Sequence, residues 1–372
     1  MKVAIFETEH FEGAFPVIKL FDIPGNEITV YTSPETHKRF LDLFGDNSRR
    51  YHWAILPGKK KVPFFTSLYK QLKKNRPDLL YINTISNNHL LYAAVLQLLH
   101  LNRTVLTVHD INCLFDSQPS LNFRKAMIHS GKKRLVKRIN EFNVVADTMT
   151  PYLQTKTNGK KSHNIPGAVF EHRYSPQLLN GPIRIVVPGS LDKRRRNYEQ
   201  VFELARLAGE NRLNVQIVLL GGYMDNEGKS IVEQADVLKS EFCRVICYHS
   251  PLVEQSEFDR QMDAAHFVFI PSVIHTHICG DIPETYGITK SSGNIFDVIK
   301  HAKPFIIPDQ LTISADLQTS CFRYKAIPDI IDFLKHMISA PADYDIWQVK
   351  ALENSKNYTI EKVRARNAAL FI

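Results

Sequence analysis

Short apolar runs alternate with stretches of helical periodicity along the whole chain, and this alternation constrains the fold more than any single motif does. The runs share length and apolar character, and they cover residues 3–6, 28–31, 53–56, 79–82, 104–108, 142–146, 183–187, 215–220, 243–248 and 267–272. Apolar residues recur at helical spacing between several of them, notably over 64–74 and 89–101. Strands alternating with helices predict an α/β protein whose parallel sheets are covered by helices on both faces. Ligands of such sheets bind beyond the carboxyl ends of the strands.

The length of the chain predicts two domains. It has 372 residues, of which 44% are hydrophobic and 23% are charged, which is too long for one ordinary core and too apolar for a disordered protein. Prolines and glycines break the pattern over 164–182. We predict domains over 1–165 and 183–350, a linker over 166–182, and a C-terminal helix over 351–372.

Cysteine content and hydropathy predict a cytoplasmic protein. The five cysteines are odd in number and scattered, which fits reduced thiols. No apolar run reaches the roughly twenty residues of a membrane-spanning helix. The N-terminus leads directly into the first apolar run, without the pattern of a signal peptide.

The segment over 284–308 carries the most chemistry. Glu284, Tyr286 and Gly287 precede a turn from Lys290 to Gly293, and helical spacing then continues to the Lys-Pro pair at 303–304. Ser291 or Ser292 is a natural N-cap. Free backbone N–H groups, the helix dipole and Lys290 favour an anion, and Glu284 can hold hydroxyls, so the pattern suggests a sugar nucleotide. The alternative is an ordinary capped helix with Glu284 on the surface.

This segment resembles the donor-binding segment of retaining glycosyltransferases of the GT-B fold, family 4 type (glycosyl transferases group 1). Members of that family carry Glu-x-Phe/Tyr-Gly, a second acid eight positions after the first, and a helix that ends in Gly-Lys-Pro. The two ends match here, while the second acid falls on Ser292 counted from Glu284, or on Asp297 counted back from residue 303. The resemblance implies two Rossmann-like lobes with parallel sheets and an interlobe cleft. It also implies that the donor sugar is held by Glu284 and by the backbone of Tyr286, Gly287, Ile288 and Thr289.

Further resemblances assign the remaining site residues. Residues 188–196 resemble the family's Gly-Arg-Leu…Lys-Gly segment, whose cations bind the donor pyrophosphate. Ser190 follows Gly189 in place of the family arginine, and Arg195 aligns with the family lysine. Fixed cations at the leaving diphosphate lower the barrier to transfer, and Lys193, Arg194 or Lys290 can assist.

His109 follows an apolar run where the family commonly has a histidine that lines the sugar site. The resemblance implies that His109 faces the anomeric region, whereas the sequence alone favours a histidine that bonds backbone at the strand end. The same resemblance puts four residues on the acceptor side and two at the nucleobase. They are His10, Glu12, Gly13 and Asp110 for the acceptor, and Tyr248 and Pro251 for the base.

The N-terminal half is strongly basic. The net charge is +9, and seven lysines and arginines but no acid lie between Arg124 and Arg138. One apolar side accompanies them, formed by Ala126, Met127, Ile128, Leu135, Val136 and Ile139. A basic amphipathic helix can dock on an anionic membrane or lie in solvent. Nucleic acid is disfavoured because no aromatic RNA-binding motif is present.

Together these features predict a hexosyltransferase-type glycosyltransferase. It would move a sugar from a UDP or GDP sugar, with retention, to a glycan or lipid-linked acceptor in polysaccharide or cell-surface glycan biosynthesis. The N-terminal domain would bind the acceptor, the second domain the donor, and the last helix would cross back to the first lobe. The alternatives are a non-catalytic nucleotide- or glycan-binding protein of this fold, a sugar-nucleotide epimerase or a phosphorylase.

A metal is not expected. His275, His277, Cys279 and Asp281 alternate like metal ligands, but the loop beside a sugar site is polar in any case. The resemblance implies no metal and no cofactor beyond the nucleoside diphosphate sugar.

Overall fold

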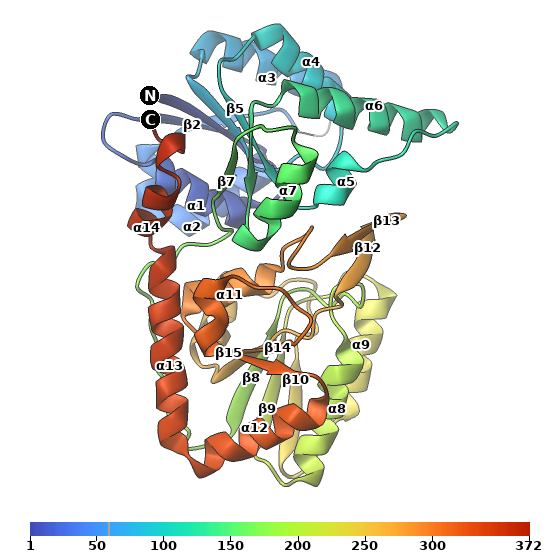
Figure 1. Ribbon diagram of the computed structural model, residues 1–372, viewed down its shortest axis with the longest axis vertical. Helices are drawn as coiled ribbons and strands as arrows, with labels where there is room; N and C mark the ends of the chain where they lie inside the picture. Colours follow the sequence, from blue (N-terminus) through green and yellow to red (C-terminus); the bar gives the residue numbers. More distant parts are fainter. Residues whose placement is uncertain (59) are drawn as a thin grey trace.

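The computed structural model describes residues 1–58 and 60–372, leaving aside the side chains of Ile278 and Cys279. It has two α/β lobes, stacked along the long axis of the molecule (Figure 1). The first lobe is built on a seven-stranded parallel sheet with the order β3-β2-β1-β4-β5-β6-β7. Its strands are β1 (Lys2–Phe6), β2 (Glu27–Thr32), β3 (His52–Ile55), β4 (Leu79–Ile82), β5 (Thr104–Val108), β6 (Glu141–Val144) and β7 (Ser162–Asn164).

Helices cover both faces of this sheet, because alternate residues of each strand point to opposite sides. In β1, Val3 and Ile5 belong to the core under α1 and α2, while Ala4 and Phe6 belong to the core under α3, α4 and α6. The helices are α1 (Phe11–Phe21), α2 (Pro34–Phe44), α3 (Lys61–Asn75), α4 (His89–Leu99), α5 (Ile111–Phe115), α6 (Phe123–Arg138) and α7 (Thr150–Lys156), with 3₁₀ turns η1 (Gly45–Arg50) and η2 (Asp147–Met149).

The second lobe repeats this design. Its parallel sheet has six strands in the order β10-β9-β8-β11-β14-β15, and a separate antiparallel hairpin is formed by β12 and β13. The strands are β8 (Ile183–Pro188), β9 (Val215–Leu220), β10 (Cys243–Cys247), β11 (Phe267–Phe269), β12 (His275–Cys279), β13 (Ile282–Thr285), β14 (Phe305–Pro308) and β15 (Cys321–Tyr324). The helices are α8 (Tyr198–Glu210), α9 (Asn226–Val237), α10 (Gln255–Asp263), α11 (Gly293–His301) and α12 (Ile327–Ser339), with a 3₁₀ turn η3 (Ala315–Ser320). The two parallel sheets confirm the predicted α/β fold with two lobes.

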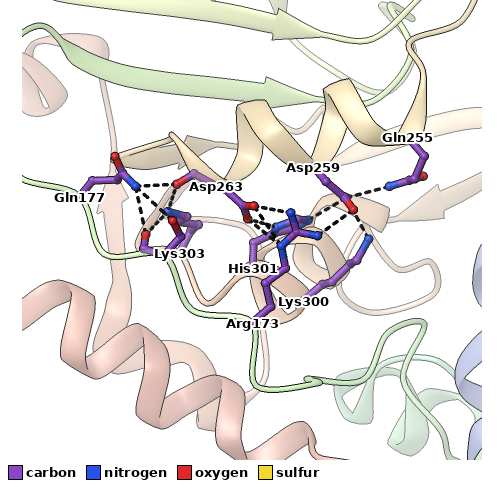
Figure 2. Close-up of polar contacts among 9 residues, drawn as sticks. Arg173, Gln177, Gln255, Asp259, Asp263, Lys300, His301 and Lys303 are labelled. Atoms are coloured by element: carbon purple, nitrogen blue, oxygen red, sulfur yellow. Dashed lines mark hydrogen bonds and ion pairs between the residues drawn. The ribbon is translucent and has the colours of Figure 1, made fainter.

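The connection between the lobes is tied to the second lobe by a partly buried ionic cluster (Figure 2). Arg173 pairs with Asp259 at 2.9 Å and with Asp263. His301, which is fully buried, lies with Nδ1 2.9 Å from Asp263. Lys303 donates to the carbonyl oxygens of Ser175 and Asp263 at 2.9 and 2.6 Å, and burial lowers its pKa to about 8. Lys303 therefore anchors the connection.

The end of the chain lies on the first lobe. Helix α13 (Pro341–Ser355) runs along the second lobe, and after η4 (Lys356–Tyr358) helix α14 (Ile360–Arg366) packs on α1 (Figure 1). The last turn is η5 (Ala368–Leu370). Arg364 donates to the carbonyl oxygens of Lys19, Leu20 and Asp22. No helix among the described residues is long and apolar enough to span a membrane.

Glu141 links this C-terminal segment to the first sheet. It accepts hydrogen bonds from Arg103 at 2.7 and 3.1 Å and from His163, and Arg103 also donates to carbonyl oxygens of residues 369, 370 and 372. Burial alone would raise the pKa of Glu141, but these hydrogen bonds lower it to about 2.

We predict that Glu141→Gln removes an acid-sensitive part of the stability. The carboxylate stabilises the fold above its ordinary pKa of 4.5, and this contribution is lost as the pH falls toward 2, at a cost on the order of 3 kcal/mol. The urea midpoint of the variant, measured from pH 3 to 7, should be lower than wild type at pH 7 and fall less steeply below pH 4.5. Glu210→Gln, in an exposed pair with Arg206, is the matched control and should follow wild type. Parallel curves for wild type and Glu141→Gln would contradict the assignment.

Candidate functional site

The two lobes meet where strands of both sheets end. Asp147, which follows β6, accepts a hydrogen bond from the Ser314 hydroxyl at 2.8 Å, and Asp110, which follows β5, pairs with Lys290. Ligands of parallel sheets bind at such strand ends, so this boundary is the candidate site.

His109 lies at the end of β5 with a defined tautomer. Its Nε2–H donates to the carbonyl oxygen of Asn83 at 3.0 Å, which leaves Nδ1 as the acceptor of the neutral ring. Burial lowers the pKa of His109, and the neighbouring His10, whose ring centre is 6.1 Å away, adds to this effect. The histidine thus bonds backbone, as one interpretation expected, and also keeps an acceptor nitrogen for a ligand.

Glu7 organises the loop before α1, a role that the sequence analysis missed. Its buried carboxylate accepts from the backbone of His10 at 2.8 Å and from the Asn83 amide at 2.6 Å. A Cβ at Gly13 would lie 3.4 Å from the same amide, an ordinary contact distance, and Glu12 is exposed. The signal available in the sequence was an acid directly after an apolar strand.

Backbone and side-chain groups of α5 bind the second lobe around Glu284. The side-chain amide of Asn112 donates to the carbonyl oxygen of Pro283 at 2.9 Å. The backbone N–H of Ile111 donates to the carbonyl oxygen of Thr289 at 2.9 Å. The N–H of Cys113 donates to Oε1 of Glu284 at 2.7 Å. These contacts hold β13 and the following turn against the strand end that carries His109.

Glu284 is fully buried, so its interpretation as a surface residue is wrong. Its Oε2 has no hydrogen-bond partner within the described part of the chain. Burial raises the pKa of Glu284 to about 7, against the opposing effect of its hydrogen bonds. A buried carboxylate oxygen without a partner is costly, and a ligand hydroxyl that donates to it would remove that cost.

The turn after Glu284 is tightly packed. Tyr286 is buried in the core of the second lobe, and Lys290 lies over its ring at 5.8 Å. Gly287 has a φ of +84°, and a Cβ there would be 2.2 Å from the carbonyl oxygen of Thr312. Ile288 is partly exposed, whereas Thr289 is buried and accepts from the N–H of Thr285.

The basic run after β8 divides into an outer and an inner part. Asp192 accepts hydrogen bonds from Arg194 at 2.8 and 2.9 Å and from Arg195 at 3.2 Å, and both arginines are largely exposed. Arg196 is buried instead, and it donates to the carbonyl oxygen of Ser190 at 2.8 Å and to the Asn294 side chain at 2.9 Å. Lys193 lies half-buried between these groups in the chain.

The sequence analysis did not single out Arg196, whose side chain packs against Gly189 in the folded structure. Gly189 has a φ of +90°, and a Cβ there would be 2.2 Å from Nη2 of Arg196. The Nε atom of Arg196 is buried without a partner among the described residues. The available signal in the sequence was Asp192. It forms ion pairs with Arg194 and Arg195 at the surface, whereas Arg196 is buried.

Helix α11 begins beside Arg196 and the end of β8. Ser292 takes the N-cap position but makes no capping hydrogen bond with its side chain. Asn294 donates to the carbonyl oxygen of Pro188 at 2.7 Å, which joins α11 to the end of β8. Burial raises the pKa of Asp297, one turn further on, to about 6, with His301, Lys300 and Arg196 opposing the shift.

The predicted nucleobase residues lie at the ends of β9 and β10. A Cβ at Gly222 would be 2.1 Å from the carbonyl oxygen of Pro251, so this segment packs directly on the end of β9. The Tyr248 hydroxyl donates to Glu257 of α10, and burial with this contact raises the pKa of Tyr248 to about 12.

No group of three or more histidine, cysteine, aspartate or glutamate side chains suited to a metal occurs in the described part of the chain. The Cys279 side chain of the alternating pattern lies outside the described residues.

A narrow cavity separates the lobes beside α11. It is lined by residues 145–148 of the first lobe and by Ser291, Ser292 and residues 311–314 of the second. Its volume of about 30 Å³ accommodates only one or two waters. In the described conformation, this cavity therefore has no room for a ligand larger than that.

Comparison with known proteins establishes the fold. No protein-family model matches the sequence, and no curated protein matches it. Among solved structures, sucrose-phosphate synthase from Thermosynechococcus elongatus is similar with a TM-score of 0.67 and 13% identity, covering 100% of this chain and 98% of that one. HepE of Anabaena, solved with UDP and glucose, has a TM-score of 0.67 and 10% identity, covering 100% and 99%. UDP-GlcNAc 2-epimerase from Neisseria meningitidis, bound to UDP-GlcNAc, has a TM-score of 0.60 and 12% identity, covering 100% and 98%.

The chain has the GT-B architecture of these proteins. Since glycosyltransferases and an epimerase share it, the fold alone does not select the reaction.

We predict that Glu284→Gln stabilises the unliganded protein at alkaline pH. Because the folded pKa of about 7 lies above the ordinary 4.5, wild-type stability falls as the pH rises from 4.5 through 7, by an amount on the order of 3 kcal/mol. Glutamine has no charge to bury, so the melting temperature of the variant should exceed that of wild type at pH 8 and not at pH 4.5. Glu233→Gln, on the exposed surface of α9, is the control. If the variant instead loses stability relative to wild type as the pH rises from 4.5 to 8, Glu284 is charged in the folded protein and its carboxylate has hydrogen-bond partners.

Proposed function

We propose that the protein is a retaining glycosyltransferase of the family 4 type that uses a UDP or GDP sugar. The observation that carries this proposal is the partnerless buried oxygen of Glu284, which lies beside the strand end carrying His109 and accepts no hydrogen bond from the described residues. A sugar hydroxyl is a donor that fits such an oxygen. The similar structures solved with UDP and glucose or with UDP-GlcNAc support a nucleotide sugar as ligand.

Each residue then has a role at one part of the donor. Glu284 and the backbone from Tyr286 to Thr289 hold the sugar, and Nδ1 of His109 accepts a hydrogen bond near the anomeric carbon. Arg195, with Lys193 and Lys290, neutralises the diphosphate that leaves, which is where negative charge develops. Arg196 acts as a positioning residue, because its hydrogen bonds to Ser190 and Asn294 fix the Gly189 loop against α11.

Lobe closure completes this site. The contacts of α5 with β13 hold Glu284 beside the end of β5, and lobes that close over a bound donor would exclude the water that otherwise hydrolyses it. We propose a glycan or lipid-linked acceptor bound by the first lobe, in cell-surface glycan biosynthesis at the inner face of the membrane.

An epimerase of the same fold is the second candidate, and the likeness to UDP-GlcNAc 2-epimerase favours it over a phosphorylase. The two reactions differ in their need for an acceptor. An epimerase changes the sugar of the donor without any acceptor, whereas a transferase releases the nucleoside diphosphate slowly by hydrolysis until an acceptor is added.

Donor binding tests the proposal. We expect one class among UDP, GDP and ADP sugars to raise the melting temperature, because a ligand of the folded state stabilises it by RT ln(1 + [L]/Kd). Glu284→Ala and Arg195→Met should each weaken that binding about 10- to 100-fold, as expected for loss of a charge-assisted hydrogen bond. Arg206→Met, in an exposed pair of the same lobe, is the matched control and should bind like wild type. If no nucleotide sugar shifts the melting temperature, the proposal is wrong.

A further inference from the structure

The N-terminal end of α6 projects from the first lobe with exposed apolar side chains (Figure 1). Phe123 is 78% exposed, Met127 45% and Ile128 42%, and Leu121, in the turn before the helix, is fully exposed. In the second half of the same helix, Leu135 is fully buried, as is Ile139 just after it. The single apolar side predicted for this helix is therefore divided into a buried and an exposed part.

Packing against α4 explains where the division falls. A Cβ at Gly131 would lie 2.7 Å from the backbone nitrogen of Leu90, so the glycine lets the two helices touch. From Gly131 onward, α6 lies on α4 and contributes to the core. Before Gly131 the helix extends past the body of the lobe, where large apolar side chains meet solvent. Clustered exposure of this kind marks an interaction surface.

Positive charge lies beside the apolar end and continues along the rest of α6. Six exposed cations of α6 are Arg124, Lys125, Lys133, Arg134, Lys137 and Arg138. Among the described residues, only Lys125 of this group has an acidic partner within ion-pair distance, the exposed Asp281 at 3.5 Å. Lys132, the seventh cation of this helix, is buried and donates to the carbonyl oxygen of Cys113. The surface therefore fits a partner that is both anionic and apolar.

The neighbouring helix α4 extends this surface without adding acids. Its outward side carries Leu91 and Leu98, which are 38% and 63% exposed, together with Ala94 and Gln97. Helix α3, which packs on the other side of α4, adds Lys70, Lys73 and Lys74 near its C-terminal end. An uncharged stripe thus lies between two basic helices.

We propose that this surface docks the first lobe on an anionic lipid bilayer, with Leu121 and Phe123 inserted between headgroups. The inference deepens the proposed function, on which it rests, by naming the surface that brings the enzyme to a lipid-linked acceptor. Cations attract anionic headgroups while the apolar end enters the acyl boundary, and neither contribution alone gives stable binding. Nucleic acid would satisfy the cations but would leave the apolar end in water. A second copy of this basic surface would be repelled.

Docking would also place the candidate site near the membrane. Helix α5, whose backbone holds Glu284, directly precedes the projecting end of α6 in the chain. Lys125 of α6 reaches Asp281 in the hairpin that carries Glu284. A bilayer at the end of α6 therefore lies beside the boundary between the lobes.

Vesicle flotation of the full-length protein tests the proposal. We expect binding to vesicles of 30% phosphatidylglycerol in phosphatidylcholine, weakened by high salt, and at least about tenfold less binding to pure phosphatidylcholine. Leu121→Ser with Phe123→Ser should lower the affinity for anionic vesicles at least about tenfold, as should Lys133→Glu with Arg134→Glu. Met224→Ser with Val237→Ser, exposed apolar residues of the second lobe, is the matched control and should bind like wild type.

Three results of the binding measurements would overturn the proposal. They are equal binding to neutral and anionic vesicles, no loss of binding in the Leu121/Phe123 variant, and tighter binding of the same surface to RNA than to vesicles. A concentration-dependent dimer that disappears in the Leu121/Phe123 variant would assign the surface to self-association instead.

Nucleotide-sugar binding, measured on the same variants in solution, separates this inference from the proposed function. If a nucleotide sugar binds wild type and both α6 variants equally but vesicles do not bind wild type, the docking surface is wrong and the transferase proposal stands. If vesicles bind as expected while no nucleotide sugar binds, the docking surface stands and the transferase proposal fails.

Discussion

The hydrogen bond between the backbone of Cys113 and the carboxylate of Glu284 joins the two lobes beside the strand end that carries His109. It satisfies one oxygen of a fully buried acid and leaves the other without a partner in the described chain. Burial of a polar atom without a hydrogen bond costs stability, and a ligand that donates to this oxygen would remove that cost. The same bond therefore holds the two lobes together and fixes the position of the carboxylate.

In the second lobe, the strand ends near the candidate site are packed closely, backbone against backbone. A Cβ at Gly221 would be 2.1 Å from the carbonyl oxygen of Gly189, so the ends of β8 and β9 approach each other more closely than any side chain permits. Arg196 fills the space beneath Gly189 and is held by Ser190 and Asn294. The start of α11, the loop after β8 and a buried guanidinium are thus fixed relative to one another before any anion binds, which is the preorganisation that charge stabilisation requires.

The sequence predicted the fold well because apolar alternation is a local property. The apolar runs correspond to observed strands of the two parallel sheets. The β12–β13 hairpin was not predicted, because its polar residues at 275–281 have no strand-like hydrophobic pattern. The site was less predictable, because the burial of Arg196 rather than Arg195 depends on Asp192 and Asn294, which lie far apart in the sequence.

The connection between β5 and β6 brings together what the two proposals need. It begins with His109 and Asp110 at the strand end, continues through α5, whose backbone binds the second lobe, and ends in the basic helix α6. If α6 rests on a bilayer, the first lobe is the fixed part and the second lobe is the part that moves to admit a donor. Opening then breaks the contacts of α5 with β13 and releases Glu284 from the first lobe, whereas the connection anchored by Arg173 and Lys303 stays with the second lobe. Membrane docking and donor entry would therefore act on opposite ends of one short segment.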